Sequence, residues 1–435
     1  MPTPTAILGM RGTGTFDSNE RPESWREMLL RLNLGGMAPL TAITAKLKNE
    51  EVNDPIFHWF EKGPWEKGAP LQDSYIYEDA AMATAVSAST NAAVGTVVYA
   101  KVLAAFAKQI RVGHVVLLRL STDHRQDKRG IVESVNTTTG AIGIRMLETD
   151  AATDYLATND RLIISGSAHA EGAARPTAVS YSPTPFYNYT QIFRTAMELT
   201  RTTMKTRLRT GNSYQEIKRD CLLDHSLEME WAFVNGIRYA ETDAVTGQPR
   251  RFTYGLVPYL VDNYSTNVLD FKVSYAGYSW YDAGKDFLDA AMELLARWKV
   301  RGDSDENFML CGSGVLLGLQ SVVEANSSYD INRGEIGYGL KVRTLETVFG
   351  TWHFMTHPLF TQELSMRNAA LIFKPKHLTY RYITDTIFKE DKSWREGGGS
   401  GTDGPQEEYL TEAGLEIHHP ETMMYLKNVG VDADS

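Results

Sequence analysis

Hydrophobic and polar positions follow two periods along the chain, and the changes between them mark the predicted elements. Apolar residues recur at roughly helical spacing over 40–48, and an aromatic strand, 56–61, follows. Short runs rich in Val and Ile, separated by turn formers, continue from 112 to 166. Such runs are typical of a small antiparallel barrel or sandwich, so we predict an inserted β-rich module over 96–170.

The longest helix is predicted over 213–236. Ser213 and Glu216 have the spacing of a capping box, in which the hydroxyl and the carboxylate each accept from an amide of the first turn. Some twenty residues without Gly or Pro follow, and Gly236 stands where helices commonly end. At 1.5 Å per residue such a helix spans about 30 Å, enough to cross a domain.

Beyond this helix, helices and strands mix without the regular alternation of a βαβ fold. A second helix is predicted to be capped by Asp282, after a Tyr- and Gly-rich stretch that predicts a loop. Its apolar face comprises Phe287, Leu288, Ala291, Leu294, Leu295 and Trp298. A further helix is predicted over 315–325, and strands over 308–311, 342–348, 351–356, 370–373 and 415–418. The fold class is therefore α+β.

Composition and charge exclude several classes of protein. At 435 residues and 43% hydrophobic composition, the chain predicts an ordinary globular protein of two or three folding units. A formal net charge of -10 opposes a role in coating phosphate backbones. Two cysteines, Cys221 and Cys311, are too few for a disulfide framework. The chain start lacks a secretory signal, and no stretch approaches the ~20 apolar residues of a membrane span, which predicts a soluble protein made in a cytoplasm.

Candidate chemical motifs fit poorly, so we predict no catalytic, cofactor or metal site. Gly284-Lys285 lacks the first glycine and the Ser or Thr of a phosphate-binding loop. Gly312-Ser-Gly314 does not fit the G-x-S-x-G nucleophile elbow, since Leu310 occupies the position of its first glycine. His353 and His357 have a zinc-ligand spacing but lie in extended sequence without the glutamate of a metalloprotease. We interpret them as structural. The adjacent His418 and His419 would point to opposite faces of a strand.

Aromatic residues are the remaining candidates. Trp59, Phe60 and Trp65 fit either carbohydrate stacking or packing against a neighbouring subunit, and the enrichment of Trp and Phe in interfaces favours packing. We therefore predict that Trp25, Trp59, Phe60, Trp65 and Trp394 contribute to inter-subunit contacts.

Several stretches together resemble the major capsid proteins of tailed bacteriophages with the Hong Kong 97-type fold, in the branch that carries a β-rich insertion. Pro39 to Leu47, followed by Asp54 to Glu61, looks like the N-terminal signature of that branch. The stretch from Ser213 to Gly236, ending in Glu230-Trp-Ala-Phe-Val-Asn-Gly, looks like its long spine helix. Val112-Gly-His-Val-Val, Glu171 to Phe193, Val348 to His353 and Gly414 to His418 are similar to later parts of the same proteins.

The resemblance implies a division of the chain into an arm, a loop and domains. The expected parts are an N-terminal arm (1–53), an extended-loop region (54–95), the β-rich insertion (96–170), a peripheral domain with the spine helix (171–280), an apical domain (281–410) and a C-terminal strand returning to the peripheral domain (411–435). Copies would form pentamers and hexamers of an icosahedral shell around double-stranded DNA, in a virion assembled in the host bacterial cytoplasm.

The same resemblance implies that the protein has no enzyme activity and binds no cofactor. It also implies a set of partner proteins. These are further copies of the chain, a portal and possibly cement proteins. The arm begins close to Met1, so a separate scaffolding protein is expected. The alternative left open is a soluble carbohydrate-active hydrolase with the β-rich module as a binding domain, which would need a cleft with convergent acid and base groups.

Overall fold

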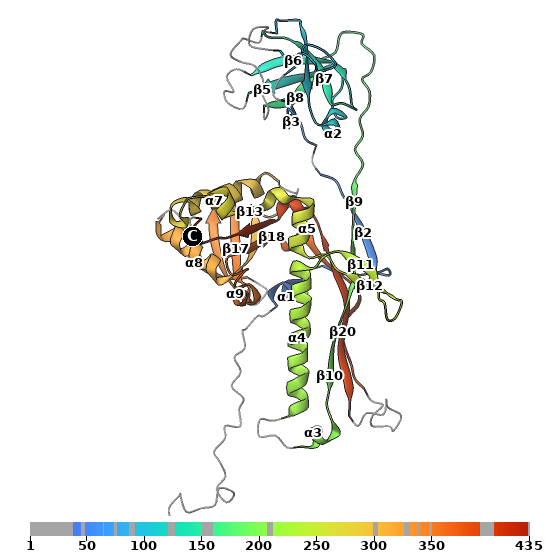
Figure 1. The fold of residues 1–435 in the computed structure, drawn as a ribbon, viewed down its shortest axis with the longest axis vertical. Helices are drawn as coiled ribbons and strands as arrows, with labels where there is room; N and C mark the ends of the chain where they lie inside the picture. Colours follow the sequence, from blue (N-terminus) through green and yellow to red (C-terminus); the bar gives the residue numbers. More distant parts are fainter. Residues whose placement is uncertain are drawn as a thin grey trace, which may run out of the picture. The chain divides into compact units, whose positions relative to one another are not determined.

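The structure is a computed structural model, and it divides into two compact units. Unit 1 comprises 1–59 and 185–435, and unit 2 comprises 60–184 (Figure 1). The structure describes residues 38–44, 48–63, 65–73, 76–86, 92–120, 127–149, 160–206, 212–298, 303–325, 331–336, 340–347, 350–391 and 404–433.

Unit 2 is built on a six-stranded sheet of order β3-β8-β5-β6-β7-β4, whose neighbours all pair antiparallel. Its elements are β3 (Gly68–Pro70), β4 (Val97–Lys101), α2 (Ala104–Ala107), β5 (His114–Arg119), β6 (Lys128–Val135), β7 (Ala141–Met146) and β8 (Arg161–Ser167). Just after β3, the Gln72 amide donates to the Lys101 carbonyl of β4 at 2.9 Å. Because β3 and β4 are the two edges of the sheet, this bond brings the edges together, as in a small barrel.

The compact unit is longer than the insertion expected over 96–170. Ala69, Leu71, Ile76, Val86 and Ala92 are buried in the core of unit 2 together with residues of β4 to β8. The segment 60–95, expected to form an extended-loop region, therefore supplies part of this core. Within this segment, β3 pairs with β8, which lies more than ninety residues further along the chain (Gly68 pairs with Ile163), so local sequence patterns could not indicate the pairing.

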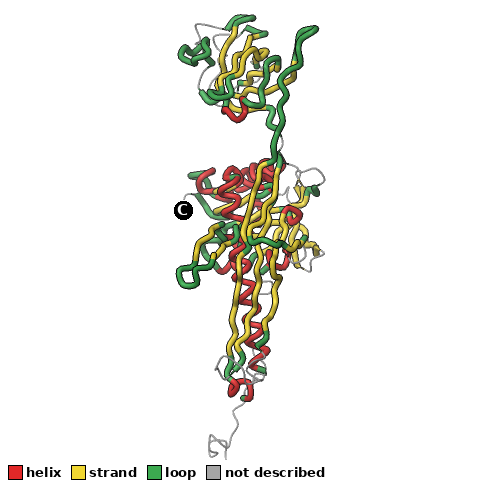
Figure 2. Tube along the Cα trace, turned by 90° about the vertical axis from the view of Figure 1, so that its right-hand side faces the viewer, coloured by secondary structure: helices red, strands yellow, loops and turns green. Residues whose placement is uncertain are grey.

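The longest helix of unit 1 is α4 (Ser213–Asn235), as the absence of Gly and Pro predicted. It lies along a four-stranded sheet of order β1-β19-β20-β10, as Figures 1 and 2 show. The strands are β1 (Asn49–Glu51), β10 (Gln191–Glu198), β19 (Leu378–Lys389) and β20 (Gln406–Ile417). Alternate residues of β10 and β20, such as Phe193, Met197 and Tyr409, are buried, and those between them are more exposed. This period of two is that of a sheet with one covered face.

A seven-stranded sheet has a different core on each face. Its order is β13-β21-β18-β14-β17-β16-β15. The strands are β13 (Val268–Asp270), β14 (Glu306–Cys311), β15 (Ile331–Ile336), β16 (Leu340–Thr347), β17 (Gly350–Thr356), β18 (Ala370–Phe373) and β21 (Met424–Lys427). Ala370 and Ile372 pack with residues of α7 (Trp280–Ala296) and α8 (Ser313–Ala325). Leu371 and Phe373 belong to the core shared with the C-terminal half of α4.

The stretch between α4 and α7 is more regular than the predicted loop. It contains a two-stranded hairpin and several short helices, which a Tyr- and Gly-rich composition did not indicate. Its elements are β11 (Tyr239–Thr242), β12 (Pro249–Phe252), α5 (Leu256–Asn263), η3 (Ser265–Asn267), β13 and α6 (Phe271–Ser274). The other elements of the chain are α1 (Pro39–Thr44), β2 (Ile56–Glu61), β9 (Thr184–Tyr189), α3 (Arg201–Lys205), α9 (Pro358–Gln362), η4 (Pro375–His377) and η5 (Pro420–Thr422).

Both predicted helix caps are wrong by a few residues. Asn212, one residue before Ser213, caps α4, since its side chain accepts from the Tyr214 amide at 3.0 Å. Ser279, not Asp282, caps α7 and accepts from the Asp282 amide at 3.2 Å. Asn and Ser both offer the short side-chain oxygen that this position requires. Within the described part of the chain, no helix has both the length and the apolar character of a membrane span.

Candidate functional site

A buried carboxyl group joins three distant parts of unit 1. Glu230, near the end of α4, accepts from the Leu40 amide at 2.8 Å and from the Thr41 amide and hydroxyl at 2.7 Å each. Its Oε1 also lies 2.7 Å from Nε2 of His357, which follows β17. We call these four residues, Glu230, His357, Leu40 and Thr41, the arm clamp.

The two ionisable side chains of the arm clamp are fully removed from solvent. The side chains of Glu230 and His357 are both 0% exposed. A buried carboxylate is tolerated only when its lone pairs are satisfied, and here two backbone amides, a hydroxyl and an imidazole do so. The first turn of α1 is thereby held on α4, since its free amides point at a carboxylate. His357 thus has the structural role expected from the sequence.

A second ion cluster ties the short strand β1 to the sheet. Arg381 of β19 contacts Glu50 of β1 and Glu416 of β20, and His418 lies 2.7 Å from Glu416. Burial raises the pKa of Glu416, but hydrogen bonds from His418 and Arg381 outweigh burial, and the net shift is downward. The carboxylate therefore stays ionised between its two partners. The arm clamp thus holds 38–44, and this cluster holds 48–51, on the rest of unit 1.

Exposed aromatic and aliphatic side chains lie on the two-stranded ribbon of β2 and β9. Ile56, His58 and Phe60 are exposed at alternate positions of β2, while Phe57 and Trp59 are buried. His58 and Tyr187 of β9 have ring centroids 5.7 Å apart, and the Arg238 guanidinium lies 4.0 Å from the centre of the Tyr187 ring. We call Ile56, His58, Phe60 and Tyr187 the ribbon face. Exposed aromatic rings next to an arginine are the composition of a protein interface.

The predicted contact residues fall into three groups. Trp59 is only 6% exposed and packs against Phe57 and Phe186, so its side chain belongs to the core of unit 1. Phe60 and Trp65 are 69% and 57% exposed, and their contact role stays a prediction. Trp65 stacks on Tyr181 with ring centroids 5.0 Å apart. Trp25 and Trp394 lie outside the described residues.

Metal-binding clusters are absent from the described ranges. No three His, Cys, Asp or Glu side chains of those ranges gather closely enough to hold a metal ion. The ring centroids of His353 and Phe308 are 5.2 Å apart, whereas His357 is hydrogen-bonded to Glu230. The two histidines with the zinc-ligand spacing therefore lie in separate environments. The described polar clusters hold segments of the chain together and anchor 38–44 on α4.

The chain belongs to the SU10 major capsid protein family, whose profile it matches over residues 10–430. It is also similar to the major capsid protein of Pseudomonas phage PaMx41, with 29% identity over 262 residues, 57% of this chain and 58% of that protein. The aligned region thus spans little more than half of the curated relative. The match confirms the resemblance to phage major capsid proteins and gives the hydrolase alternative no support. The α+β class is confirmed by the elements themselves.

Solved capsid structures resemble the chain at low identity. The match to the capsid of a native GTA particle covers 95% of this chain and 97% of that capsid chain, with 6% identity and a TM-score of 0.42. A structure of Mycobacterium phage Cain covers 92% and 90%, with 9% identity and a TM-score of 0.42. The capsid of Myoviridae phage XM1 covers 57% and 76%, with 14% identity and a TM-score of 0.34.

Proposed function

We propose that this chain is the repeating subunit of an icosahedral phage head, and that its copies form pentamers and hexamers enclosing double-stranded DNA. The observation that carries the proposal is the family match over residues 10–430. In this proposal α4 is the spine of a peripheral domain (171–280), and the seven-stranded sheet lies mainly in an apical domain (281–410), with 411–435 returning to the peripheral domain.

The N-terminal arm (1–53) is proposed to cross to neighbouring subunits from a fixed origin. The arm clamp supports this role, because it holds Leu40 and Thr41 on the buried face of α4. If the arm transmits force between subunits, its attachment to its own subunit must not unfold before its contact with the neighbouring subunit breaks. The buried carboxylate supplies one, since breaking a buried pair on one side costs about 3–5 kcal/mol.

The contacts between copies are proposed to include the ribbon face and Trp65, with Trp25 and Trp394 as further candidates. Exposed large aromatic residues on a subunit are characteristic of interfaces, and the central ones carry most of the binding energy. The β-rich unit 2, which would represent the insertion of one capsid-protein branch, would add contacts through Trp65. No enzyme activity is required for assembly.

Interior and exterior partners belong to the same proposal. The formal net charge of -10 supports a lining that contains DNA without sequence-specific binding, because few phosphate contacts release few counterions. A separate scaffolding protein, a portal and possibly cement proteins would complete the head. Assembly would take place in the host bacterial cytoplasm, and the product would be the virion capsid.

Deleting residues 1–38 tests the proposal. The truncated chain keeps the arm clamp and is expected to fold with the circular dichroism spectrum of the full chain. It is expected to fail to close a stable shell under conditions in which the full chain forms particles visible by negative-stain microscopy. Normal particles from the truncated chain would refute the role of the arm.

Boiling assembled particles in detergent tests how the shell is held. We expect non-covalent locking by the arm and the extended loop, so that a single band of 48.6 kDa appears. A ladder of cross-linked subunits would contradict this part of the proposal.

A further inference from the structure

The turn before β5 in unit 2 brings a buried histidine next to an arginine. The His114 amide donates to the Arg111 carbonyl at 3.1 Å, which closes a turn of four residues. Gly113 lies within this turn at φ +89°. Its amide donates to the Val132 carbonyl of β6, and its carbonyl accepts from the Ala168 amide just after β8. The turn is therefore held from both sides of β5, whose neighbours in the sheet are β8 and β6 (Figure 1).

One ring nitrogen of His114 has no partner. The residue is only 8% exposed, and its Nδ1 accepts from the Arg111 amide at 3.3 Å. The neutral ring therefore carries its proton on Nε2. Among the described residues this N–H has no acceptor, yet Nε2 keeps some contact with solvent. Because polar groups this deeply placed are normally hydrogen-bonded, Nε2 marks a place for an acceptor on a ligand.

Two further side chains that can carry positive charge lie against the same turn. The ring of His169 covers Gly113, since a Cβ built there would lie 2.5 Å from Cε1 of that ring. Arg111 is partly exposed, and its Nη1 donates to the Thr177 carbonyl at 3.1 Å. Its Nε is buried, so a ligand reaches only the Nη groups. These carry four of the five N–H groups of a guanidinium, and the Thr177 carbonyl takes one of them.

The charges that act on His114 are all positive. Burial lowers the pKa of His114, and Arg111, Lys67 and His169 lower that pKa further. No carboxylate in the described part of unit 2 offsets this shift. An anion that approaches the turn therefore meets a positive potential.

Neighbouring acidic residues do not cancel this potential. Glu133, next to Val132 on β6, accepts from Arg145 at 2.5 Å. Glu66 and Glu171 lie close along the chain to Lys67 and His169, but neither contributes to the pKa shift of His114.

The charged residues of unit 2 outside the described ranges all belong to 121–126 and 150–159. Leu120 and Asp160, which adjoin these two stretches, lie at the far end of β5, where Arg119 pairs with Arg161. His114 begins β5 and is about 17 Å away along the strand. Both stretches thus join the sheet at the end remote from the turn.

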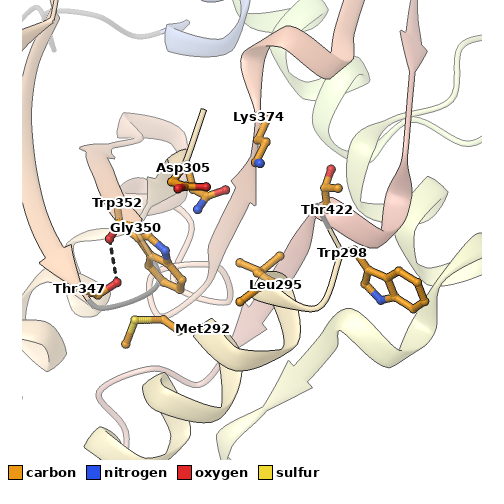
Figure 3. Close-up of a pocket in the computed structure, with 11 residues that line it drawn as sticks. Met292, Leu295, Trp298, Asp305, Thr347, Gly350, Trp352, Lys374 and Thr422 are labelled. Carbon is orange, nitrogen blue, oxygen red and sulfur yellow. Dashed lines mark hydrogen bonds between the residues drawn. The ribbon is translucent and has the colours of Figure 1, made fainter. Parts of the chain in front are cut away.

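A lysine in unit 1 shows the opposite arrangement, in which the chain itself supplies the counter-charge. Lys374 lies in the wall of a cavity of about 360 Å³ at one end of the seven-stranded sheet (Figure 3). Its ammonium lies 3.4 Å from Asp303 Oδ2 and 3.2 Å from the Ser304 carbonyl. Arg111 has no such carboxylate partner within the described ranges. Its charge is therefore open to an anion from outside.

We propose that Arg111, His114 and His169, together the β5 turn site, bind a phosphate group whose oxygens accept from Nε2 of His114 and from the Nη groups of Arg111. Phosphate fits because its several oxygens can accept from donors on separate side chains, and because arginine presents its N–H groups in the geometry that phosphate accepts. Lys67 adds attraction at longer range. Two sources share this chemistry: free phosphate, and the phosphate backbone of nucleic acid. The proposal concerns unit 2 and does not rest on the shell function.

Binding is tested on the free full-length subunit with inorganic phosphate as the probe, by isothermal titration calorimetry at neutral pH and low ionic strength. The unaltered subunit is expected to bind phosphate at millimolar concentration. His114→Phe, which keeps a ring at this position, and Arg111→Gln are each expected to bind at least tenfold more weakly. The matched control is His58→Phe, at an exposed position of β2 in unit 1, which is expected to bind like the unaltered subunit.

NMR of the His114 ring gives a second readout that needs no variant. Bound phosphate is expected to raise the pKa of His114, because an adjacent anion favours the protonated imidazole. A histidine that serves only to complete the turn would show no such change.

Three results overturn the proposal: absence of phosphate binding by the unaltered subunit, unchanged binding in folded His114→Phe and Arg111→Gln, or a pKa of His114 that does not respond to phosphate. A short DNA duplex added to the phosphate complex then separates the two sources. Displacement of phosphate assigns the site to a nucleic-acid backbone, and retention of phosphate assigns it to the free ion.

Discussion

Replacing Glu230 by glutamine changes one atom in the arm clamp and is expected to loosen the N-terminal segment. The carboxylate accepts from two backbone amides, Leu40 on Oε1 and Thr41 on Oε2. A glutamine side chain has only one oxygen. Whichever way its amide is turned, an NH2 group faces one of the two backbone amides, so a donor meets a donor.

The expected cost follows from these contacts. A hydrogen bond to a charged group contributes about 1.5–3 kcal/mol, and the opposed amide loses its partner at a buried position for Leu40 or a partly buried one for Thr41. Weakening of the contact with His357 adds to the loss, because the glutamine oxygen carries no charge. We expect Glu230→Gln to lower the free energy of unfolding by about 2–4 kcal/mol. Glu230→Ala, which leaves His357 and both amides without a partner, is expected to cost about 3–5 kcal/mol.

Two assays on the free subunit measure the effect. Urea unfolding followed by circular dichroism gives the change in stability. Hydrogen exchange of the peptide covering 38–44 reports local release, and a loss of about 2 kcal/mol in the opening energy would speed exchange of Leu40 and Thr41 by roughly thirtyfold.

The matched control is Glu228→Gln on the same helix. Glu228 is exposed and accepts only a long bond of 3.3 Å from Thr195, so its replacement is expected to change stability by less than about 0.5 kcal/mol. Wild-type stability together with wild-type exchange at 38–44 in Glu230→Gln would refute the arm clamp as the anchorage of this segment.

Four further substitutions test other parts of the account. Trp59→Ala should lower the free energy of unfolding in urea by about 3–5 kcal/mol, because Trp59 is a core residue. Phe60→Ala, at the next and exposed position, should lower it by less than about 0.5 kcal/mol and yet reduce the yield of particles measured by light scattering. Equal particle yields would show that Phe60 does not take part in the contact. Burial lowers the pKa of His377 to about 4, so the unfolded chain binds the proton more tightly and stability is lost as pH falls from about 6.5 to 4. His377→Gln should flatten that pH dependence by about 2–3 kcal/mol, and an unchanged slope would show that His377 does not titrate in this range. Gly350→Ala should lower the free energy of unfolding by at least about 1–3 kcal/mol, since Gly350 has φ +132° and a Cβ there would lie 2.3 Å from the Asp305 carbonyl. An unchanged melting temperature would contradict this backbone geometry.

The sequence predicted those elements whose signal is local. The helix at 213–235 lacks breakers, and the strands at 114–119, 128–135 and 141–146 are β-branched runs between turns, so each could be recognised within its own residues. The loop predicted after α4 was wrong because α5 and its neighbours are too short to establish a clear period. The helix caps were predicted wrongly because the side chains of Asn212 and Ser279 can accept from a helix N-terminal amide as well as those of Ser213 and Asp282, the residues predicted.

The arm clamp could not be predicted from local patterns, because Glu230 and Leu40 are 190 residues apart. One signal did exist. Glu230 shares a helix face with the buried Phe233 and Val234, three and four residues further on, where a charged residue requires an internal partner. Local sequence could not reveal that partner, and the boundaries of unit 2 escaped prediction for the same non-local reason.

Cryo-electron microscopy of the largest species formed by the purified full-length chain tests the central claim most directly. The account predicts closed particles of regular size with icosahedral symmetry, in which the ribbon face and Trp65 are buried against a neighbouring copy. Symmetric shells in which these residues remain exposed would contradict the proposed contact, and a chain that stays a monomer in the presence of the proposed scaffolding protein would contradict the shell function itself.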